Sequence, residues 1–562
     1  MNRWLQLVTL LAIASVTFAA DAPRPKTGTV LGSVSDAVKG TPLSGASITL
    51  KPLPGYNPHL STDLLAATSD PEGKFAVNDV PPGKYLLIAK KNGFLDGTYG
   101  SKASWKSGIP ISVDVGDVVK DVSVNLVPGA VISGIVENED GEGFPNVSVR
   151  ALQYRYQWPG KKLTVVSATT TNDHGEYRLH GLMPGSYYIV CSTRRDRVIK
   201  ENGVSTVARY PVTFYPSVTT VETAATTSVK AGDEAVVKVV LTPAKVYSIH
   251  GKVAGADPDA KVALLVKPLL DTPEERQNIA VSDFGSFDVK GLLPGNYELM
   301  AIGAVRGRTA SGKRRITIDD RDQNDVLITL DYERPAIRGS VVLPFGVERS
   351  KLAVNLVPGT SSDDEDGDDS TMVLGPVRPV GSPITDMYGQ FTAAQLTRDA
   401  KTVFATIQPL SSGFEDFYVA AVRRNGEDVT NTGFNPARGG SLQIEYLRDS
   451  GRIEGTVASG DGQAISGATV IVIPDVPRRG RRDLYRMLRA DQKGEFAIRG
   501  VAPGKYTILA CDCDIENEAI YDADYMKPYL ALSKAQSIEV TPRGKSFLVL
   551  GAIADTTDLG AP

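Results

Sequence analysis

Few residues in this chain have the types and spacing that catalysis needs. A zinc carboxypeptidase needs a His-x-x-Glu pair, since that spacing puts two ligands on one side of a turn, and a distant third histidine. None of the 4 histidines has a glutamate three places later; the residues at that spacing after His59, His174, His180 and His250 are Thr62, Tyr177, Met183 and Val253. The sequence also has no His-Glu-x-x-His, no Gly-x-Ser-x-Gly nucleophile motif and no phosphate-binding glycine loop. We therefore predict no enzymatic activity, no catalytic residues, no metal site and no cofactor.

The 3 cysteines divide between two faces of predicted strands. Cys191 stands at an inward position that alanine fills in the related strands described below, so we interpret it as a buried structural thiol. Cys511 and Cys513 follow the inward Ala510 by one and three places and should project together to the opposite, exposed face. There they could bridge locally or capture a metal, although a disulfide between residues i and i+2 of a strand is strained. The sequence leaves their oxidation state open.

Two charged runs invite a binding hypothesis. In the acidic run 361–369, Gly367 fits the sixth position of a calcium-binding EF-hand loop, but the first and twelfth positions are then Ser362 and Val373, so the bidentate glutamate is missing. We favour a solvated loop and leave calcium binding open. The basic run 478–482 could meet anionic glycans, lipid headgroups or the acidic run, but we favour an exposed, protease-sensitive loop. The net charge of −4 indicates no nucleic-acid partner.

An aromatic strip is the best candidate for a binding surface. Counting in steps of two places Tyr154, Tyr156 and Trp158 on one side of a strand, opposite in parity to the core positions 147, 149 and 151. With Arg155 nearby, such a strip could stack on sugar rings and bond their hydroxyl groups. Packing of these aromatics against a neighbouring domain or under a long loop is the competing interpretation.

A strand pattern recurs along the chain at a fixed interval. An aromatic residue of an alternating strand precedes the tyrosine of a Pro-Gly-x-Tyr segment by ten places, in the pairs Phe75 and Tyr85, Tyr177 and Tyr187, Phe287 and Tyr297, and Phe496 and Tyr506. Pro-Gly suits the centre of a type II turn. After it, Tyr85, Leu87 and Ala89 share one face, which predicts a core layer that tapers from large to small side chains.

Two further signals complete each repeat. Upstream of the first aromatic is an Asp-to-Gly turn, at Asp70–Gly73, Asp173–Gly175, Asp283–Gly285, Asp386–Gly389 and Asp491–Gly494. Each repeat opens with a Gly-x-Val strand, whose glycines are Gly32, Gly134, Gly251, Gly339 and Gly455. The fourth copy is degenerate because it lacks the Pro-Gly-x-Tyr segment. Short strands with turns every 8–12 residues predict β-sandwiches.

The chain divides by these repeats into a leader and five predicted modules. A basic start, an apolar stretch from Trp4 to Phe18 and small residues at 19 and 20 predict a cleavable signal peptide over 1–20. The modules span 27–127, 128–243, 244–334, 335–448 (degenerate) and 449–552. We find no later apolar run that could span a membrane, so we expect an exported protein without a membrane span in its mature chain, secreted, periplasmic or at the cell surface.

The combined motifs resemble those of carboxypeptidase regulatory-like domains, and the resemblance covers most of the mature chain. It implies an all-β fold, a tandem array of about five seven-stranded Greek-key sandwiches of the transthyretin or immunoglobulin type. It also implies extracellular or cell-envelope modules, as in bacterial tandem arrays. Five such modules in line would span roughly 170 Å as a stiff rod.

We therefore expect a non-catalytic spacer and binding array. Its preferred ligand is a polysaccharide or envelope glycan, bound through Tyr154, Arg155, Tyr156 and Trp158. One alternative is an adhesin or envelope assembly factor that binds another envelope protein by strand addition. Another is an accessory subunit of an exported peptidase.

Overall fold

The chain folds almost entirely into β-strands. The computed structural model describes residues 27–53, 65–101, 108–157, 160–201, 204–255, 261–269, 277–281, 285–305, 308–332, 337–348, 351–359, 383–393, 402–411, 413–436, 439–513, 515, 518–532 and 534–553. Within these ranges α1 (Ala523–Leu530) is the one α-helix. The all-β tandem sandwich architecture expected from the sequence is confirmed.

The strands follow one another in groups, which we name modules 1 to 5 after the predicted ranges. Module 1 contains β1 (Gly28–Asp36), β2 (Ser47–Pro52), β3 (Leu65–Thr68), β4 (Lys74–Val80), β5 (Gly83–Lys90), β6 (Gly97–Thr98), β7 (Ile111–Val113) and β8 (Val118–Leu126). Module 2 contains β9 (Ala130–Glu137), β10 (Ser148–Gln157), β11 (Gly160–Thr170), β12 (Glu176–Leu182), β13 (Gly185–Ser192), β14 (Asp196–Glu201), β15 (Val204–Arg209), β16 (Thr213–Phe214), η1 (Val221–Thr223), β17 (Thr226–Val229) and β18 (Glu234–Val240). Module 3 contains β19 (Ala244–Lys245), β20 (Tyr247–Ala254), β21 (Lys261–Pro268), β22 (Gln277–Ala280), β23 (Ser286–Leu292), β24 (Gly295–Val305), β25 (Arg308–Ile318), β26 (Gln323–Thr329) and β27 (Asp331–Tyr332).

Modules 4 and 5 complete the chain. Module 4 contains β28 (Ile337–Val342), β29 (Leu352–Pro358), β30 (Gln390–Ala393), β31 (Val403–Pro409), β32 (Tyr418–Arg424), β33 (Glu427–Asp428) and β34 (Gly440–Leu447). Module 5 contains β35 (Gly451–Ala458), β36 (Thr469–Pro474), η4 (Val476–Arg478), η5 (Arg482–Leu484), β37 (Arg486–Arg489), β38 (Glu495–Val501), β39 (Gly504–Cys511), η6 (Ala519–Tyr521), α1, β40 (Gln536–Val540) and β41 (Lys545–Ile553). The module boundaries stay a prediction, since β19 of module 3 pairs with β15 of module 2.

One pairing scheme recurs in all five groups. The opening strand of each pairs antiparallel with the strand that carries the repeated aromatic residue and parallel with a later strand; these triplets are β4-β1-β8, β12-β9-β18, β23-β20-β26, β30-β28-β34 and β38-β35-β41. A second sheet, which contains β2, β10 or β21, accompanies it in modules 1 to 3, and β29 pairs with β31 in module 4. In module 5 the pairing of β39 with β41 joins the strands into one seven-stranded sheet. Because the degenerate module 4 keeps the triplet, the opening strand defines the fold more than the Pro-Gly-x-Tyr segment does.

The opening glycine is required by close packing. A Cβ on Gly32 would lie 2.5 Å from Cζ of Phe75 and 2.0 Å from the carbonyl oxygen of Val122. The aromatic ring of the neighbouring strand therefore covers the glycine, while the parallel strand closes over it from the other side. A Cβ on Gly251, Gly339 or Gly455 would likewise meet the ring of the repeated phenylalanine.

The structure confirms the left-handed glycines of the Asp-to-Gly turns and corrects the Pro-Gly turns. The five turn glycines have φ between 73° and 78°; they are Gly73, Gly175, Gly285, Gly389 and Gly494. In module 2, however, Asn172 rather than Asp173 accepts the backbone N–H bonds of the turn. The Pro-Gly glycines Gly185 and Gly504 have φ of 154° and 136°, far from about +80° of a type II turn. The left-handed residue stands three places before the proline, as at Gly181 and Gly500.

The tyrosine of the Pro-Gly-x-Tyr segment stabilises the connection between the two repeated strands through its hydroxyl group. In all four copies the hydroxyl donates to the backbone carbonyl four residues earlier, in the pairs Tyr85 and Pro81, Tyr187 and Met183, Tyr297 and Leu293, and Tyr506 and Ala502, at 2.6–2.8 Å. The rings are buried in their modules' cores. A phenylalanine would fill the core equally well but would leave the carbonyl without this donor.

We expect Tyr187→Phe to lower the free energy of unfolding of module 2 by about 1 kcal/mol, because the Met183 carbonyl loses its hydroxyl partner. Calorimetry of the full chain would measure the change. Tyr388→Phe is the control, since the Tyr388 side chain is largely exposed and should change stability by less than about 0.5 kcal/mol. Equal effects of the two substitutions would contradict this role of the hydroxyl group.

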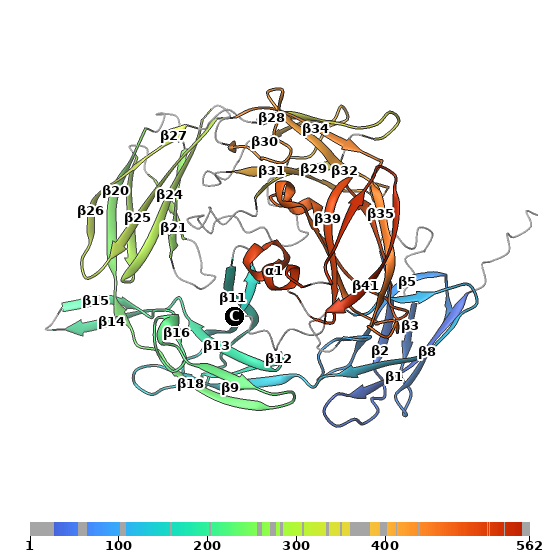
Figure 1. Cartoon of the computed structure of the whole chain (residues 1–562). Coiled ribbons are helices and arrows are strands. Elements are labelled where there is room, and N and C mark those ends of the chain that lie inside the picture. The colour runs from blue at the N-terminus through green and yellow to red at the C-terminus, as the bar shows by residue number, and fades with distance from the viewer. Residues whose placement is uncertain are drawn as a thin grey trace, which may run out of the picture.

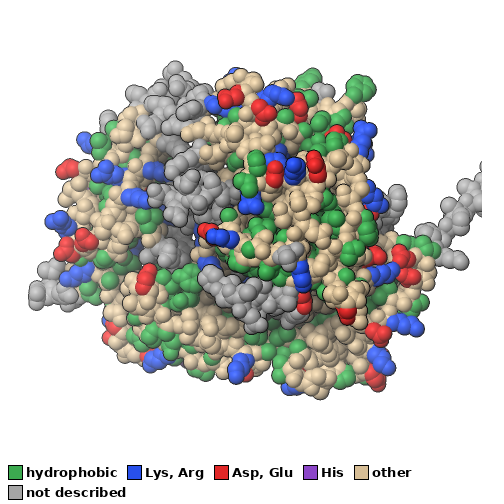
Figure 2. All heavy atoms as spheres, viewed as in Figure 1, with side chains coloured by type: hydrophobic (Ala, Val, Ile, Leu, Met, Phe, Trp, Pro, Cys, Tyr) green, Lys and Arg blue, Asp and Glu red, His purple; other side chains and the backbone are tan. Residues whose placement is uncertain are grey.

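The modules form a ring instead of the expected rod (Figure 1). Arg209 of module 2 donates to the Gly291 carbonyl of module 3, Arg481 of module 5 to that of Val419 in module 4, and Lys84 of module 1 pairs with Asp491 of module 5. The first and last modules therefore meet, with α1 and β11 near the middle of the view in Figure 1. Both signs of charged side chain are scattered over this face (Figure 2).

Candidate functional site

The predicted aromatic strip lies on the outer face of the second sheet of module 2. Leu152 has the same parity as the tyrosines of the strip and packs in an apolar cluster with Leu163, Val190 and Phe214. This cluster is separate from the core cluster that contains Val149. The Tyr154 side chain is 43% exposed, and its ring meets the Tyr188 ring edge to face at 5.9 Å. One tyrosine of the strip is thus accessible beside a packed apolar surface.

The other predicted members are placed differently. Arg155 has the opposite parity on β10, and its Nη2 lies 4.0 Å from the Sδ atom of Met183. Arg155 therefore does not share a face with the tyrosines. Trp158 lies outside the described residues. The carbohydrate-binding role of these residues stays a prediction.

Tyr156 connects module 2 to module 5. Its hydroxyl donates to Oδ2 of Asp522 at 2.5 Å, and its ring lies 6.0 Å from that of Tyr525. The other oxygen of Asp522 accepts the backbone N–H groups of Asp524 and Tyr525, which caps the first turn of α1. Burial, the hydrogen bond and the negative charge of Asp522 all raise the pKa of Tyr156, which therefore stays a neutral donor.

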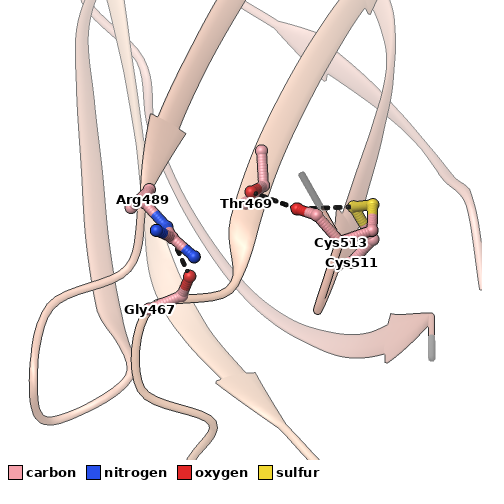
Figure 3. The surroundings of a disulfide bond; sticks show 5 residues. All are labelled: Gly467, Thr469, Arg489, Cys511 and Cys513. Atoms are coloured by element: carbon pink, nitrogen blue, oxygen red, sulfur yellow. Dashed lines mark hydrogen bonds between the residues drawn. A yellow bond between two sulfur atoms is a disulfide. The ribbon is translucent and has the colours of Figure 1, made fainter. Parts of the chain in front are cut away.

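Tyr156 also packs on a second apolar cluster of module 5. This cluster lies on the face of β36 and β39 away from the main core, and includes Leu509, Cys511, Cys513, Met526 and Tyr529. The two cysteines form a disulfide, and the Cys513 carbonyl accepts from the Thr469 hydroxyl at 2.9 Å (Figure 3). The cysteines project away from the core, as predicted, but they are buried and not exposed, because η6 and α1 belong to the cluster that covers this face.

The basic run 478–482 is a packed segment, which corrects the expectation of an exposed loop. The Arg478 guanidinium lies 4.6 Å from the centre of the Tyr506 ring, and Arg482 lies 5.3 Å from that of Tyr521. Arg481 is buried and bonds both Asp483 and the Val419 carbonyl of module 4. Burial lowers the pKa of Arg482, although nearby acidic and phenolic groups oppose this shift. Arg481 thus stabilises the junction of modules 4 and 5, whereas Arg478 and Arg482 pack within module 5.

A pocket of about 440 Å³ opens at this junction. Its lining residues come from modules 4 and 5 and are Gly359, Thr402, Phe404, Thr432, Ile473, Val476, Arg479, Gly480, Tyr485, Ile520, Tyr521, Asp522, Ala523, Met526 and Leu530. Three aromatic rings thus surround the space, with threonine, arginine and aspartate side chains between them. Because Asp522 also accepts from Tyr156, this tyrosine of the strip lies beside the pocket.

The sequence carried one signal for this region. Asp522 is a preferred helix N-cap residue, and it precedes α1 directly. The proline at position 528 argues against a helix there, yet it lies inside α1. The pocket itself joins segments more than a hundred residues apart, which no local pattern indicates.

The structure adds two further observations on chemistry. In the described ranges, no three His, Cys, Asp or Glu side chains gather in a way that could hold a metal ion. The acidic run 361–369 lies outside those ranges. Among the same residues, no helix has the length and apolar character needed to cross a bilayer.

Comparison with known proteins finds a family similarity over the first module. Residues 29–127 match the model of the carboxypeptidase regulatory-like domain, which confirms the resemblance for this part of the chain. A comparison with curated proteins finds no match. The solved structures with similarity include GBS52, the minor pilin of Streptococcus agalactiae (14% identity, TM-score 0.22, 39% of this chain and 97% of that chain). They also include a streptococcal ancillary pilin (12%, 0.20, 54% and 99%) and BcpA, the major pilin subunit of Bacillus cereus (10%, 0.15, 75% and 99%).

Proposed function

We propose that this protein is an exported, non-catalytic array of β-sandwich modules that binds carbohydrate at the junction of modules 4 and 5. The observation that carries the proposal is the pocket with the rings of Phe404, Tyr485 and Tyr521 in its lining. Its volume lies within the range of roughly 300–1,000 Å³ that is usual for ligand sites.

The lining has the two kinds of group that sugars require. Aromatic rings offer flat apolar surfaces to the C–H faces of a pyranose. The side chains of Thr402, Thr432 and Arg479 also line the pocket and can bond hydroxyl or carboxylate groups. Asp522 is occupied by the N-cap and by Tyr156, so we assign it the role of holding the wall in place. Tyr154 and Trp158 stay the second candidate surface for the same ligand class.

A binding screen of the full chain on a glycan array, followed by titration of the best glycan, tests the proposal. We expect Arg479→Ala to weaken binding at least tenfold, since a charged hydrogen bond contributes about 1.5–3 kcal/mol. The matched control is Arg178→Ala, because the Arg178 side chain is mostly exposed on module 2. Binding that survives Arg479→Ala but is lost in Tyr154→Ala would move the ligand to the strip. The absence of any glycan signal would reject carbohydrate binding.

Exposed apolar side chains in module 4 favour a second candidate function, binding of another envelope protein. Phe345 follows β28 and is fully exposed, while Met387 and Tyr388 precede β30 and are largely exposed. β28 and β30 pair, and Val341 donates to the Gly389 carbonyl, so both segments lie at one end of the module. Pull-down of an envelope protein that is insensitive to salt and is lost in Phe345→Ser with Met387→Ser would support this function. A catalytic partner recovered in that pull-down would indicate an accessory subunit of a peptidase.

A further inference from the structure

Modules 1 and 5 meet through side chains that are about 380 residues apart in the chain. The Gln492 carboxamide accepts from the Ser112 N–H at 2.9 Å and donates to the Ser112 carbonyl at 2.8 Å. The Gln492 backbone N–H also donates to the Pro110 carbonyl. Ser112 belongs to β7, which among the described strands pairs with β5 alone, so one side of β7 is a sheet edge. Gln492 thus pairs this edge as a neighbouring strand would.

A buried ion pair stands beside this contact. Lys84 is the cross-strand neighbour of Ser112, and its Nζ lies 2.6 Å from Oδ2 of Asp491. The Asp491 side chain is 1% exposed and the Lys84 side chain 18%. Breaking a buried pair is costly, because it leaves a charge without its partner in a dry place. Lys493 adds a more exposed pair with Asp114 at 2.9 Å.

Shape complementarity completes the interface. Ile109 is buried, and its Cδ1 lies so close to Gly467 that a Cβ there would come within 2.5 Å of it. The Gly467 carbonyl is held by Nε of Arg489 at 2.8 Å (Figure 3). Any larger residue at 467 would displace the Cδ1 end of the Ile109 side chain.

The surface on module 5 is specific to that module. All five modules have a turn that ends at a glycine, and the residues two places before that glycine in the sequence are Pro71, Asp173, Asp283, Met387 and Gln492. Only glutamine offers both a donor and an acceptor to a strand edge. The turn of module 4 shows the difference, since Met387 is largely exposed.

We propose that Gly467 and the turn 491–494 form a docking surface for the β5–β7 edge of module 1, and that a second copy of this chain can supply that edge. The two surfaces differ, so the contact is heterologous: it closes a ring within one chain or joins copies head to tail. Within one chain the edge is already beside the docking surface, which favours the closed ring in dilute solution. Release of a chain's own edge leaves both surfaces free for other copies.

Two full-length variants, each with one damaged surface, test this proposal by complementation. Lys84→Asp places a carboxylate against buried Asp491 and damages only the module 1 surface. Gln492→Ala with Lys493→Asp removes the strand-like bonds and sets like charges against Asp114, so it damages only the module 5 surface. Neither variant has two intact surfaces, but an equimolar mixture has one intact surface of each kind.

We expect each variant alone to be a monomer with a larger radius of gyration than the wild type in small-angle scattering. Light scattering after gel filtration of the mixture at about 100 μM should show a complex of twice the monomer mass. Asp173→Ala, at the exposed turn of module 2, should match the wild type in both measurements. Variants as compact as the wild type, or a mixture that stays monomeric while both variants keep wild-type circular dichroism, would overturn the proposal.

Discussion

Replacing Gly455 by alanine is expected to unfold module 5 at temperatures where the rest of the chain is folded. A Cβ at this position would lie 2.0 Å from the Leu548 carbonyl oxygen and 2.8 Å from Cζ of Phe496. The first of these atoms belongs to the backbone of β41, which pairs in parallel with β35 at this residue and cannot rotate away. We expect a loss of at least about 3 kcal/mol, since the parallel strands must separate. For a module of about 100 residues, this corresponds to a fall in midpoint of about 12–24 °C.

Gly460→Ala is the matched control for this substitution. Gly460 is five residues away in the same module, and an added Cβ there meets nothing within 4 Å. Alanine should therefore be neutral or slightly stabilising, because it restricts the unfolded chain. Differential scanning calorimetry of both full-length variants would separate the cases. A midpoint for Gly455→Ala within a few degrees of the control would show that the opening strand can adjust, and would refute the packing argument for the repeat.

The sequence predicts the interior of each module well because that information is local. Alternation along Tyr85, Leu87 and Ala89 specifies which face is buried, and all three side chains are buried as expected. The same period places Tyr154 and Tyr156 on one side of β10. The turn glycines are equally local, since Asp and Gly determine a turn within four residues. The type II turn predicted at Pro-Gly was wrong because the left-handed residue lies three places before the proline. That residue is Asp79 in module 1 and glycine in the other copies.

The contacts between modules could not be predicted in this way. In the sequence, Gln492 looks like an ordinary polar turn residue. Its partner Ser112 is 380 places away, so no local pattern predicts their contact. The rod was predicted from the number of modules alone. The ring depends on the angle between neighbouring modules at each junction, which the sequence does not give. Likewise, clustered arginines usually indicate a solvated loop, but Arg481 and Arg482 pack against module 4 and against Tyr521. One alternative was that aromatics of the strip pack against a neighbouring domain. Tyr156 does so, since it lies against α1 of module 5.

The second large effect concerns the thiol of Cys191. Burial among apolar side chains raises its pKa to about 12, because the thiolate would lose its hydration in the core of module 2. At pH 8 about one thiol in 10,000 is then ionised, against about a quarter for an ordinary thiol with a pKa of about 8.5. Since the other two cysteines form a disulfide, Cys191 is the single free cysteine of the chain. We expect iodoacetamide to alkylate it at least 1,000-fold more slowly in the folded protein than in urea.

Mass spectrometry of the full chain over a labelling time course measures this ratio directly. Tyr187 shares the core of module 2 with Cys191, so Tyr187→Phe should open that core more often and speed labelling about fivefold for each 1 kcal/mol lost. Gly455→Ala acts in module 5 and should leave the labelling rate unchanged if the modules unfold independently. A rise in Gly455→Ala equal to that in Tyr187→Phe would mean that the ring unfolds as one unit, with the contact between Tyr156 and Asp522 coupling modules 2 and 5. Fast labelling of the folded wild type would instead show that Cys191 is accessible, and that the inward face of β13 is not the closed core layer that its alternation indicates.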